Sequence, residues 1–203
     1  AMPEHEQQVE RIVAEFGTSG DDCRDVFKAF GAGTRPGRHE ALAEERYPVL
    51  RERLAQGLRD GALGIGVAHQ YYPGVTYDEI FRVFQFAAER QAPVFTHVRS
   101  MGVAAVQEVV TNAVATGASL HIVHLNSSSL GQYRTNLDLI LGARARGADI
   151  TAESYPYTAA STDIGSAMFD DGWQELLQIG YEDVQLQETG ERLTAETFPR
   201  HRE

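Results

Sequence analysis

The sequence has only one cysteine and one lysine, and the scarcity of these residues excludes some kinds of binding site. A lone cysteine, Cys23, excludes an internal disulfide and any zinc site built from several cysteines. Cys23 lies in a helical pattern, where a small packing role is favoured over that of a nucleophile. The 18 basic residues are outnumbered by 29 acidic ones, for a net charge of -11. Because phosphate binding needs clustered basic side chains, nucleic acid is not an expected partner.

Long hydrophobic runs are also absent. No stretch of about 18 uninterrupted apolar residues occurs, so we expect no membrane-spanning helix and no membrane partner. The N-terminal residues lack the basic and then apolar pattern of a secretory signal, and we therefore expect a cytoplasmic protein. No glycine-rich phosphate-binding motif follows an apolar run, which leaves nucleotide binding without support.

What the sequence does contain is a repeated unit. Four short apolar runs rich in Val, Ile and Phe each end in a polar cluster, and the first three are followed by a helical pattern. The runs are "ALGIGVAHQ", "APVFTHVRS", "SLHIVHLNS" and "ADITAESYPY". His69, His97 and His124 end the first three, at separations of 28 and 27 residues. Strands alternating with helices at this spacing predict a parallel sheet, in either a (β/α) barrel or a doubly wound fold.

The helices between these runs carry their own start and stop signals. Thr76 and Glu79 form a capping box at the start of "TYDEIFRVFQFAAER". Gly117 and Gly147 are placed to end the next two helices in a left-handed turn. The chain thus divides into a mainly helical segment over 1–60, βα repeats over 61–163 and a helical or irregular segment over 164–203.

The first segment contains two amphipathic helical patterns, "EHEQQVERIVAEFG" and "EERYPVLRERLAQGL". In the last segment we expect a short helix near 173–178, a short extended piece near 183–187 and a terminal helix.

Polar residues at the strand ends are the candidates for function, because ligands bind at the carboxyl edge of parallel sheets. His97 and His124 lie at equivalent depth on neighbouring strands about 4.8 Å apart, so a shared Zn²⁺ is one interpretation and a hydrogen-bonded sheet edge the other. A catalytic zinc needs at least one further protein ligand. His121 is three residues from His124, so alternation predicts the opposite, helix-facing side and a structural role. His69 is either a third pocket residue or part of the turn.

Two more groups lie at the same edge. Arg99 shares a face with His97 and could pair with a substrate carboxylate or with an acid such as Glu153. Tyr155 and Ser161 follow the fourth run and bring hydroxyl donors suited to an anionic or amide substrate, with packing as the alternative for a tyrosine.

Five motifs, taken in their order along the chain, indicate a family resemblance. "GALGIGVAHQYYPG", "THVRS", "HIVHLNSSS", "SYPYTAAST" and "GERLTAETF" resemble the N-acyl-D-amino-acid deacylase family of the amidohydrolase superfamily, over roughly residues 46–200. The resemblance implies a metal-dependent hydrolase on a (β/α)₈ TIM barrel that cleaves the amide of N-acyl-D-amino acids with a zinc-bound water. By it, the four strands are the fourth to seventh of the barrel, so the fold class is α/β with a partial barrel.

The resemblance also assigns residues. His97 and His124 match the zinc-binding histidines, and Tyr155 and Ser161 match positions that hold the substrate carboxylate. Asn126 stands where many relatives have a lysine for the same purpose, and Arg99 is a candidate to compensate.

Three family elements have no counterpart in these residues: the His-x-His of a first strand, a strand-borne bridging ligand, and the aspartate of the eighth strand. Three hypotheses follow. The chain is a deacylase-type hydrolase, or it is a catalytically incomplete protein that binds a ligand, forms a homo-oligomer or assembles with a complementing chain, or it is a small open-sheet protein with structural histidines.

Overall fold

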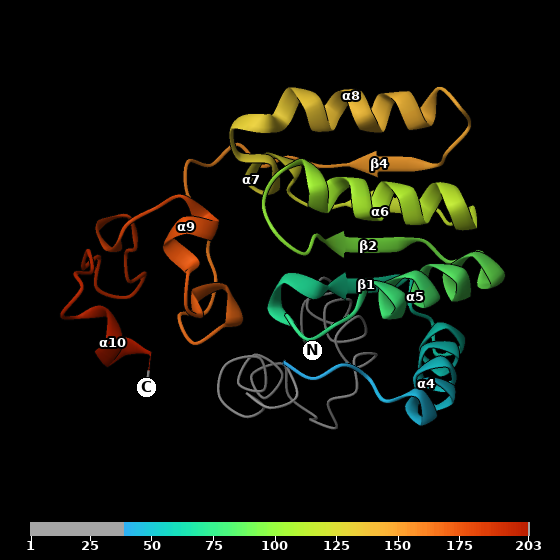
Figure 1. Cartoon of the computed structure of the whole chain (residues 1–203), viewed down its shortest axis with the longest axis horizontal. Helices are drawn as coiled ribbons and strands as arrows, with labels where there is room; N and C mark the ends of the chain where they lie inside the picture. Colours follow the sequence, from blue (N-terminus) through green and yellow to red (C-terminus); the bar gives the residue numbers. More distant parts are fainter. Residues whose placement is uncertain (1–38, 203) are drawn as a thin grey trace.

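A computed structural model describes residues 39–202 and shows a four-stranded parallel sheet in the order β1-β2-β3-β4 (Figure 1). The strands are β1 (Ile65–Ala68), β2 (Val94–His97), β3 (Leu120–Ile122) and β4 (Ile150–Ala152). All four lie in the runs predicted as strands. Each strand pairs with the next one in the sequence, and the described strands show no reversal of order of the kind that defines a doubly wound sheet. This order is that of a barrel segment.

Helices cover one face of the sheet. The helix α4 (Tyr47–Arg59) precedes β1, and α5 (Tyr77–Arg90), α6 (Val103–Thr116) and α8 (Tyr133–Arg144) follow β1, β2 and β3. The last three pack side by side in sequence order (Figure 1). Short pieces complete this region: η2 (Glu44–Arg46), η3 (His69–Tyr71), α7 (Leu125–Ser129) and η4 (Leu130–Gln132). The predicted helices over this part of the chain are confirmed, whereas the helix predicted over 4–17 lies outside the described residues.

Alternate residues of each strand form the core with these helices. The buried strand residues in this core are Ile65, Val67, Val94, Leu120, Ile122 and Ile150. The residues between them, such as Gly66, Phe95 and His121, are only half-buried. The helix-covered face is therefore apolar except for Thr96, and the opposite face of the sheet carries His97 and His121.

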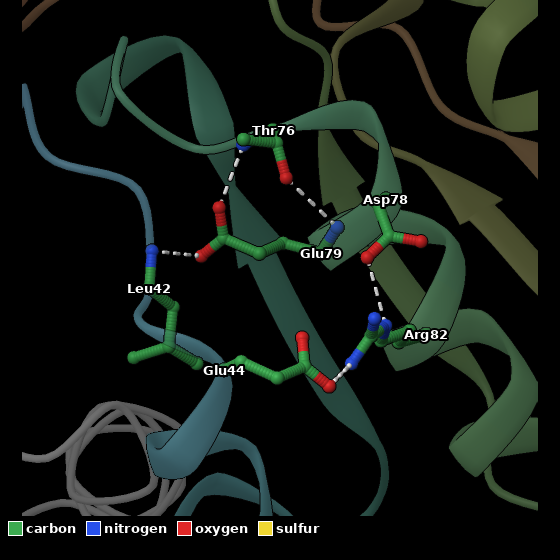
Figure 2. A network of polar contacts seen from close by, with 6 residues as sticks. All are labelled: Leu42, Glu44, Thr76, Asp78, Glu79 and Arg82. Carbon is green, nitrogen blue, oxygen red and sulfur yellow. Dashed lines mark hydrogen bonds and ion pairs between the residues drawn. The ribbon is translucent and has the colours of Figure 1, made fainter.

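The start of α5 is fixed by a polar network (Figure 2). The Glu79 backbone N–H donates to Thr76 Oγ1 at 3.1 Å, and the Thr76 N–H donates back to Glu79 Oε2 at 2.7 Å, which confirms the predicted capping box. The other oxygen of Glu79 accepts from the Leu42 N–H at 3.1 Å. Arg82 extends the network by pairing with Asp78 and Glu44. The network thus attaches the segment before α4 to the helix after β1.

The C-terminal segment forms a second apolar cluster at the carboxyl edge of the sheet. It contains η5 (Ala167–Phe169), α9 (Trp173–Leu177), η6 (Tyr181–Asp183) and α10 (Phe198–His201). The buried members of the cluster are Met168, Phe169, Trp173, Leu177, Leu193 and Phe198. In Figure 1 the arrowheads of β1, β2 and β4 point toward α7 and this orange-to-red segment. Tyr71 and Met101, which follow β1 and β2, pack against the cluster.

The short helix predicted near 173–178 and the terminal helix are confirmed, and the extended piece near 183–187 pairs through one antiparallel bridge between Gln185 and Arg192. Over residues 39–202, none of the helices combines the length and the apolar character that a membrane crossing requires. The cytoplasmic location stays a prediction.

Candidate metal and substrate site

Two histidines meet at the carboxyl edge of the sheet. His97 is the last residue of β2, and His124 is the residue before α7. Their rings pack edge to face with centroids 4.5 Å apart and an interplanar angle of 76°. Zinc binds imidazole nitrogens at about 2.0–2.1 Å, so two rings that share an ion must lie close together, as these two rings do.

A turn at the end of β3 brings His124 to this place. Glu153 bonds both sides of the turn, because its N–H donates to Ile122 O at 3.1 Å and its carbonyl accepts from the Leu125 N–H at 2.8 Å. Between these two bonds His124 adopts φ 38° and ψ 52°, a left-handed conformation that non-glycine residues rarely take. Such a conformation persists only where surrounding bonds enforce it, and it is found often at functional sites.

Both rings are held neutral. Burial lowers the pKa of His97 to about 4, with a further lowering by the nearby His124. Burial likewise lowers the pKa of His124. A neutral imidazole has a nitrogen lone pair that can bind a metal without first losing a proton. The electrostatic state of the pair therefore suits metal binding near neutral pH.

The hydrogen bonds of both rings involve Nδ1. His97 Nδ1 lies 3.1 Å from the carbonyl oxygen of Val98, which can only accept, so Nδ1 of His97 carries the proton. His124 Nδ1 lies 3.1 Å from Ser127 Oγ and 3.2 Å from Ser128 Oγ. Both serines lie in the short helix α7. In His97, Nε2 is the atom left to bind a ligand.

The helix-facing side predicted for His121 was wrong. His121 pairs in register with Phe95 and Thr151, and all three lie on the face of the sheet away from the helices. The ring of His121 packs on Phe95 and bonds Thr151 Oγ1 at 2.8 Å, and its Nε2 lies 3.5 Å from Glu153. Alternation applies only within a strand, and β3 ends at Ile122, so the turn at His124 returns the second histidine to the same face.

His69 is fully enclosed at the end of β1. Its side chain is 2% exposed, and neither ring nitrogen has a hydrogen-bond partner among the described residues. The neighbouring Gln70 is 5% exposed, and its amide is likewise unpartnered within 39–202. Burial, with Arg99 and His97 nearby, lowers the pKa of His69 to about 3. Buried polar groups without partners are costly, so this corner is a candidate place for a bound polar group.

Arg99 lies beside the histidines but is held by protein groups. Its guanidinium forms a two-point ion pair with Glu108 at 2.8 and 2.9 Å and lies over the ring of Tyr77 at 4.4 Å. A third bond runs from its Nη1 to the Val75 carbonyl at 2.5 Å. The alternative acid considered from the sequence, Glu153, pairs with His121 instead. Carboxylate binding by Arg99 stays a prediction.

Asn126 and Tyr155 are brought together through the backbone. The Asn126 amide donates to Tyr155 O at 3.2 Å and accepts from Tyr155 N–H at 3.3 Å. The ring of Tyr155 stacks on Tyr157 with centroids 6.3 Å apart, and Ser161 lies exposed further along the same segment. Asn126 therefore fixes the backbone of the segment that carries the predicted hydroxyl donors.

The residues present fit part of a metal site. His97 and His124 match the nitrogen ligands that zinc prefers. Among residues 39–202, however, no group of three or more His, Cys, Asp or Glu side chains is arranged to hold an ion. The described part of the chain thus offers two candidate ligands and not a complete set.

Two known proteins are similar in sequence to part of this chain. A D-aminoacylase of Alcaligenes xylosoxydans xylosoxydans is 29% identical over 148 residues, which cover 69% of this chain and 30% of that protein. An N-acyl-D-glutamate deacylase of the same organism is 30% identical over 135 residues, which cover 63% of this chain and 27% of that protein. The chain is similar in sequence to members of the D-aminoacylase family. No protein-family model matches it.

Solved structures of the D-aminoacylase family confirm the fold. The N-acyl-D-glutamate deacylase of Bordetella bronchiseptica, solved with zinc and a phosphonate inhibitor, aligns with a TM-score of 0.54 and 22% identity over 72% of this chain and 37% of that one. A D-aminoacylase described as defining a novel subset of amidohydrolases aligns with a TM-score of 0.51 and 24% identity, over 64% of this chain and 29% of that one. The predicted partial TIM barrel is confirmed, and the chain spans about a third of the length of its relatives.

Proposed function

We propose that this chain supplies part of the metal and substrate site of a hydrolase that cleaves the amide bond of N-acyl-D-amino acids. The observation that carries the proposal is the contact between His97 and His124, with centroids 4.5 Å apart at the carboxyl edge of the sheet. Both rings are neutral, and His97 keeps Nε2 available. The relationship to D-aminoacylase and N-acyl-D-glutamate deacylase supports the reaction class.

In this proposal His97 and His124 hold a zinc ion. A zinc ion bound there would polarise the substrate carbonyl and activate a water for attack on it. The chain's own contribution is to hold both rings neutral and at a set distance. The Val98 carbonyl fixes the tautomer of His97, and the turn that Glu153 stabilises places His124.

The remaining candidates would bind the substrate. Tyr155 and Ser161 are proposed to hold the carboxylate, with Asn126 positioning the segment that carries them. His69 is proposed to contact a polar substrate group, because its two ring nitrogens lack partners within the described residues. For Arg99 to bind a carboxylate, it would have to share its guanidinium between the substrate and Glu108.

Two measurements on the purified chain test the proposal. The zinc content is determined after dialysis against a zinc buffer, and hydrolysis of N-acetyl-D-glutamate is followed by release of the free amino acid. N-acetyl-L-glutamate is the matched control substrate. Bound zinc with D-selective hydrolysis supports the proposal, whereas a chain with neither contradicts it for this polypeptide.

A second function is favoured by the incomplete ligand set. With only two ligands within 39–202, the chain would act as a half-site that a complementing chain or a second copy completes. This alternative predicts weak zinc binding by the isolated chain, no hydrolysis, and self-association in size-exclusion chromatography. A chain that elutes as a monomer and hydrolyses the substrate rules it out.

A further inference from the structure

Two serine hydroxyls contact Nδ1 of the His124 ring. Ser127 and Ser128 both lie in α7 and place their Oγ atoms 3.1 and 3.2 Å from His124 Nδ1. Ser128 is 1% exposed, and its carbonyl accepts from the Gly102 N–H at 2.8 Å, which attaches α7 to the start of α6. Because Ser128 is enclosed, water cannot readily replace its hydroxyl.

The direction of the Ser127 bond follows from proton counting. A serine hydroxyl has one proton, and that of Ser127 is donated to the carbonyl oxygen of His124 at 3.1 Å. Its oxygen can therefore meet His124 Nδ1 only as an acceptor. When the Ser128 hydroxyl also accepts from Nδ1, Nδ1 of His124 carries the ring proton and the lone pair of the neutral ring is on Nε2.

We propose that Ser127 and Ser128 are positioning residues that hold His124 as the tautomer whose Nε2 binds the metal ion. The inference rests on the proposed function, since it concerns the same half-site. It gives His124 the arrangement that Val98 gives His97, so that both rings have Nδ1 bonded to protein oxygen and Nε2 as the ligand atom. Groups that bond the outer nitrogen of a ligating histidine orient the ring and change metal affinity when removed.

The experiment compares Ser127→Ala, Ser128→Ala and the double variant with Ser129→Ala. Ser129 is the matched control, because it is a buried hydroxyl of the same helix that accepts from Asn136 Nδ2 at 2.9 Å and does not contact His124. Zinc affinity is measured by calorimetry, and the His124 tautomer by the ¹⁵N shifts of its ring in the metal-free chain. Thermal unfolding reports whether each variant remains folded.

We expect the double variant to bind zinc about 10- to 100-fold more weakly than the wild type. We also expect its His124 ring to lose the preference for the tautomer with the proton on Nδ1. The Ser127→Thr variant, which keeps a hydroxyl at this position, should retain both the zinc affinity and the tautomer of the wild type. Ser129→Ala should lower the unfolding temperature and leave zinc affinity and tautomer unchanged. An unchanged tautomer and affinity in the double variant overturn the inference.

The two readouts separate this inference from the proposed function. If the wild-type chain binds no zinc, the metal proposal fails, while the ring ¹⁵N shifts still show whether the serines select the tautomer. If the wild type binds zinc and the serine variants match it in both readouts, the inference alone fails.

Discussion

The imidazole rings of His97 and His124 meet edge to face at 4.5 Å although the two residues are separated by 26 others in the sequence. Two different local structures bring the rings together. His97 is placed by the regular end of β2, whereas His124 is placed by a left-handed turn beyond β3. The consequences can be tested one residue at a time.

Replacing either member of the pair should remove zinc binding. We expect His97→Asn and His124→Asn each to weaken zinc affinity at least about 100-fold, because one ligand remains where two were present. His121→Asn is the matched control, since His121 lies on the same face but bonds Thr151 and Glu153. Calorimetric titration with zinc provides the measurement, and equal losses in all three variants would contradict the assignment.

The ion pair between Arg99 and Glu108 should be essential for stability. Their side chains are 17% and 6% exposed, so removing one partner leaves the other charge poorly solvated. We expect Arg99→Met or Glu108→Gln to lower the free energy of unfolding by about 3 kcal/mol. The double variant should lose less than the sum of the two, because neither charge is then left alone. Urea unfolding measures all three, and strict additivity would show that the pair is not coupled.

The cap of α5 should contribute less to the free energy of unfolding than the ion pair between Arg99 and Glu108. Thr76→Ala removes the oxygen that accepts from the Glu79 N–H, and we expect a loss of about 1 kcal/mol in the free energy of unfolding. Thr76→Ser keeps the hydroxyl and should stay close to wild type. A serine variant as unstable as the alanine variant would point to the methyl group and not to the cap.

Acid should destabilise the fold through His69. Its pKa is about 3 in the folded chain, so between that pH and its ordinary value near 6.5 the unfolded chain binds a proton that the folded chain does not. Stability is therefore lost as the pH falls through this window. The contribution reaches about 2 kcal/mol between pH 7 and pH 5.

Urea unfolding at both pH values, with a chelator present, checks the prediction for His69. His69→Gln should reduce the loss between pH 7 and pH 5 by about 2 kcal/mol. His201→Gln, which changes an exposed histidine, should leave the loss unchanged. Identical pH profiles for His69→Gln and wild type would contradict it.

Local signals were sufficient for most of the fold. The spacing of apolar runs predicted the four strands, and the capping box at Thr76 and the glycine at Gly117 predicted helix ends that the structure confirms. These features depend on residues close in the sequence, where the φ, ψ and hydrogen-bonding preferences of each side chain act directly. The metal interpretation of His97 and His124 used the same regularity, one strand after another.

The sequence by itself determined the βα period, the apolar strand runs and the residue types at the carboxyl edge. Only the tertiary structure decided how those residues are used. His124 lies on the same face of the sheet as His121 because strand alternation stops at Ile122, and Arg99 is bound to Glu108 from the following helix. The ring of His124 faces His97 because Glu153, the residue after β4, holds the turn. Such contacts join residues far apart in the chain, and no local pattern encodes them.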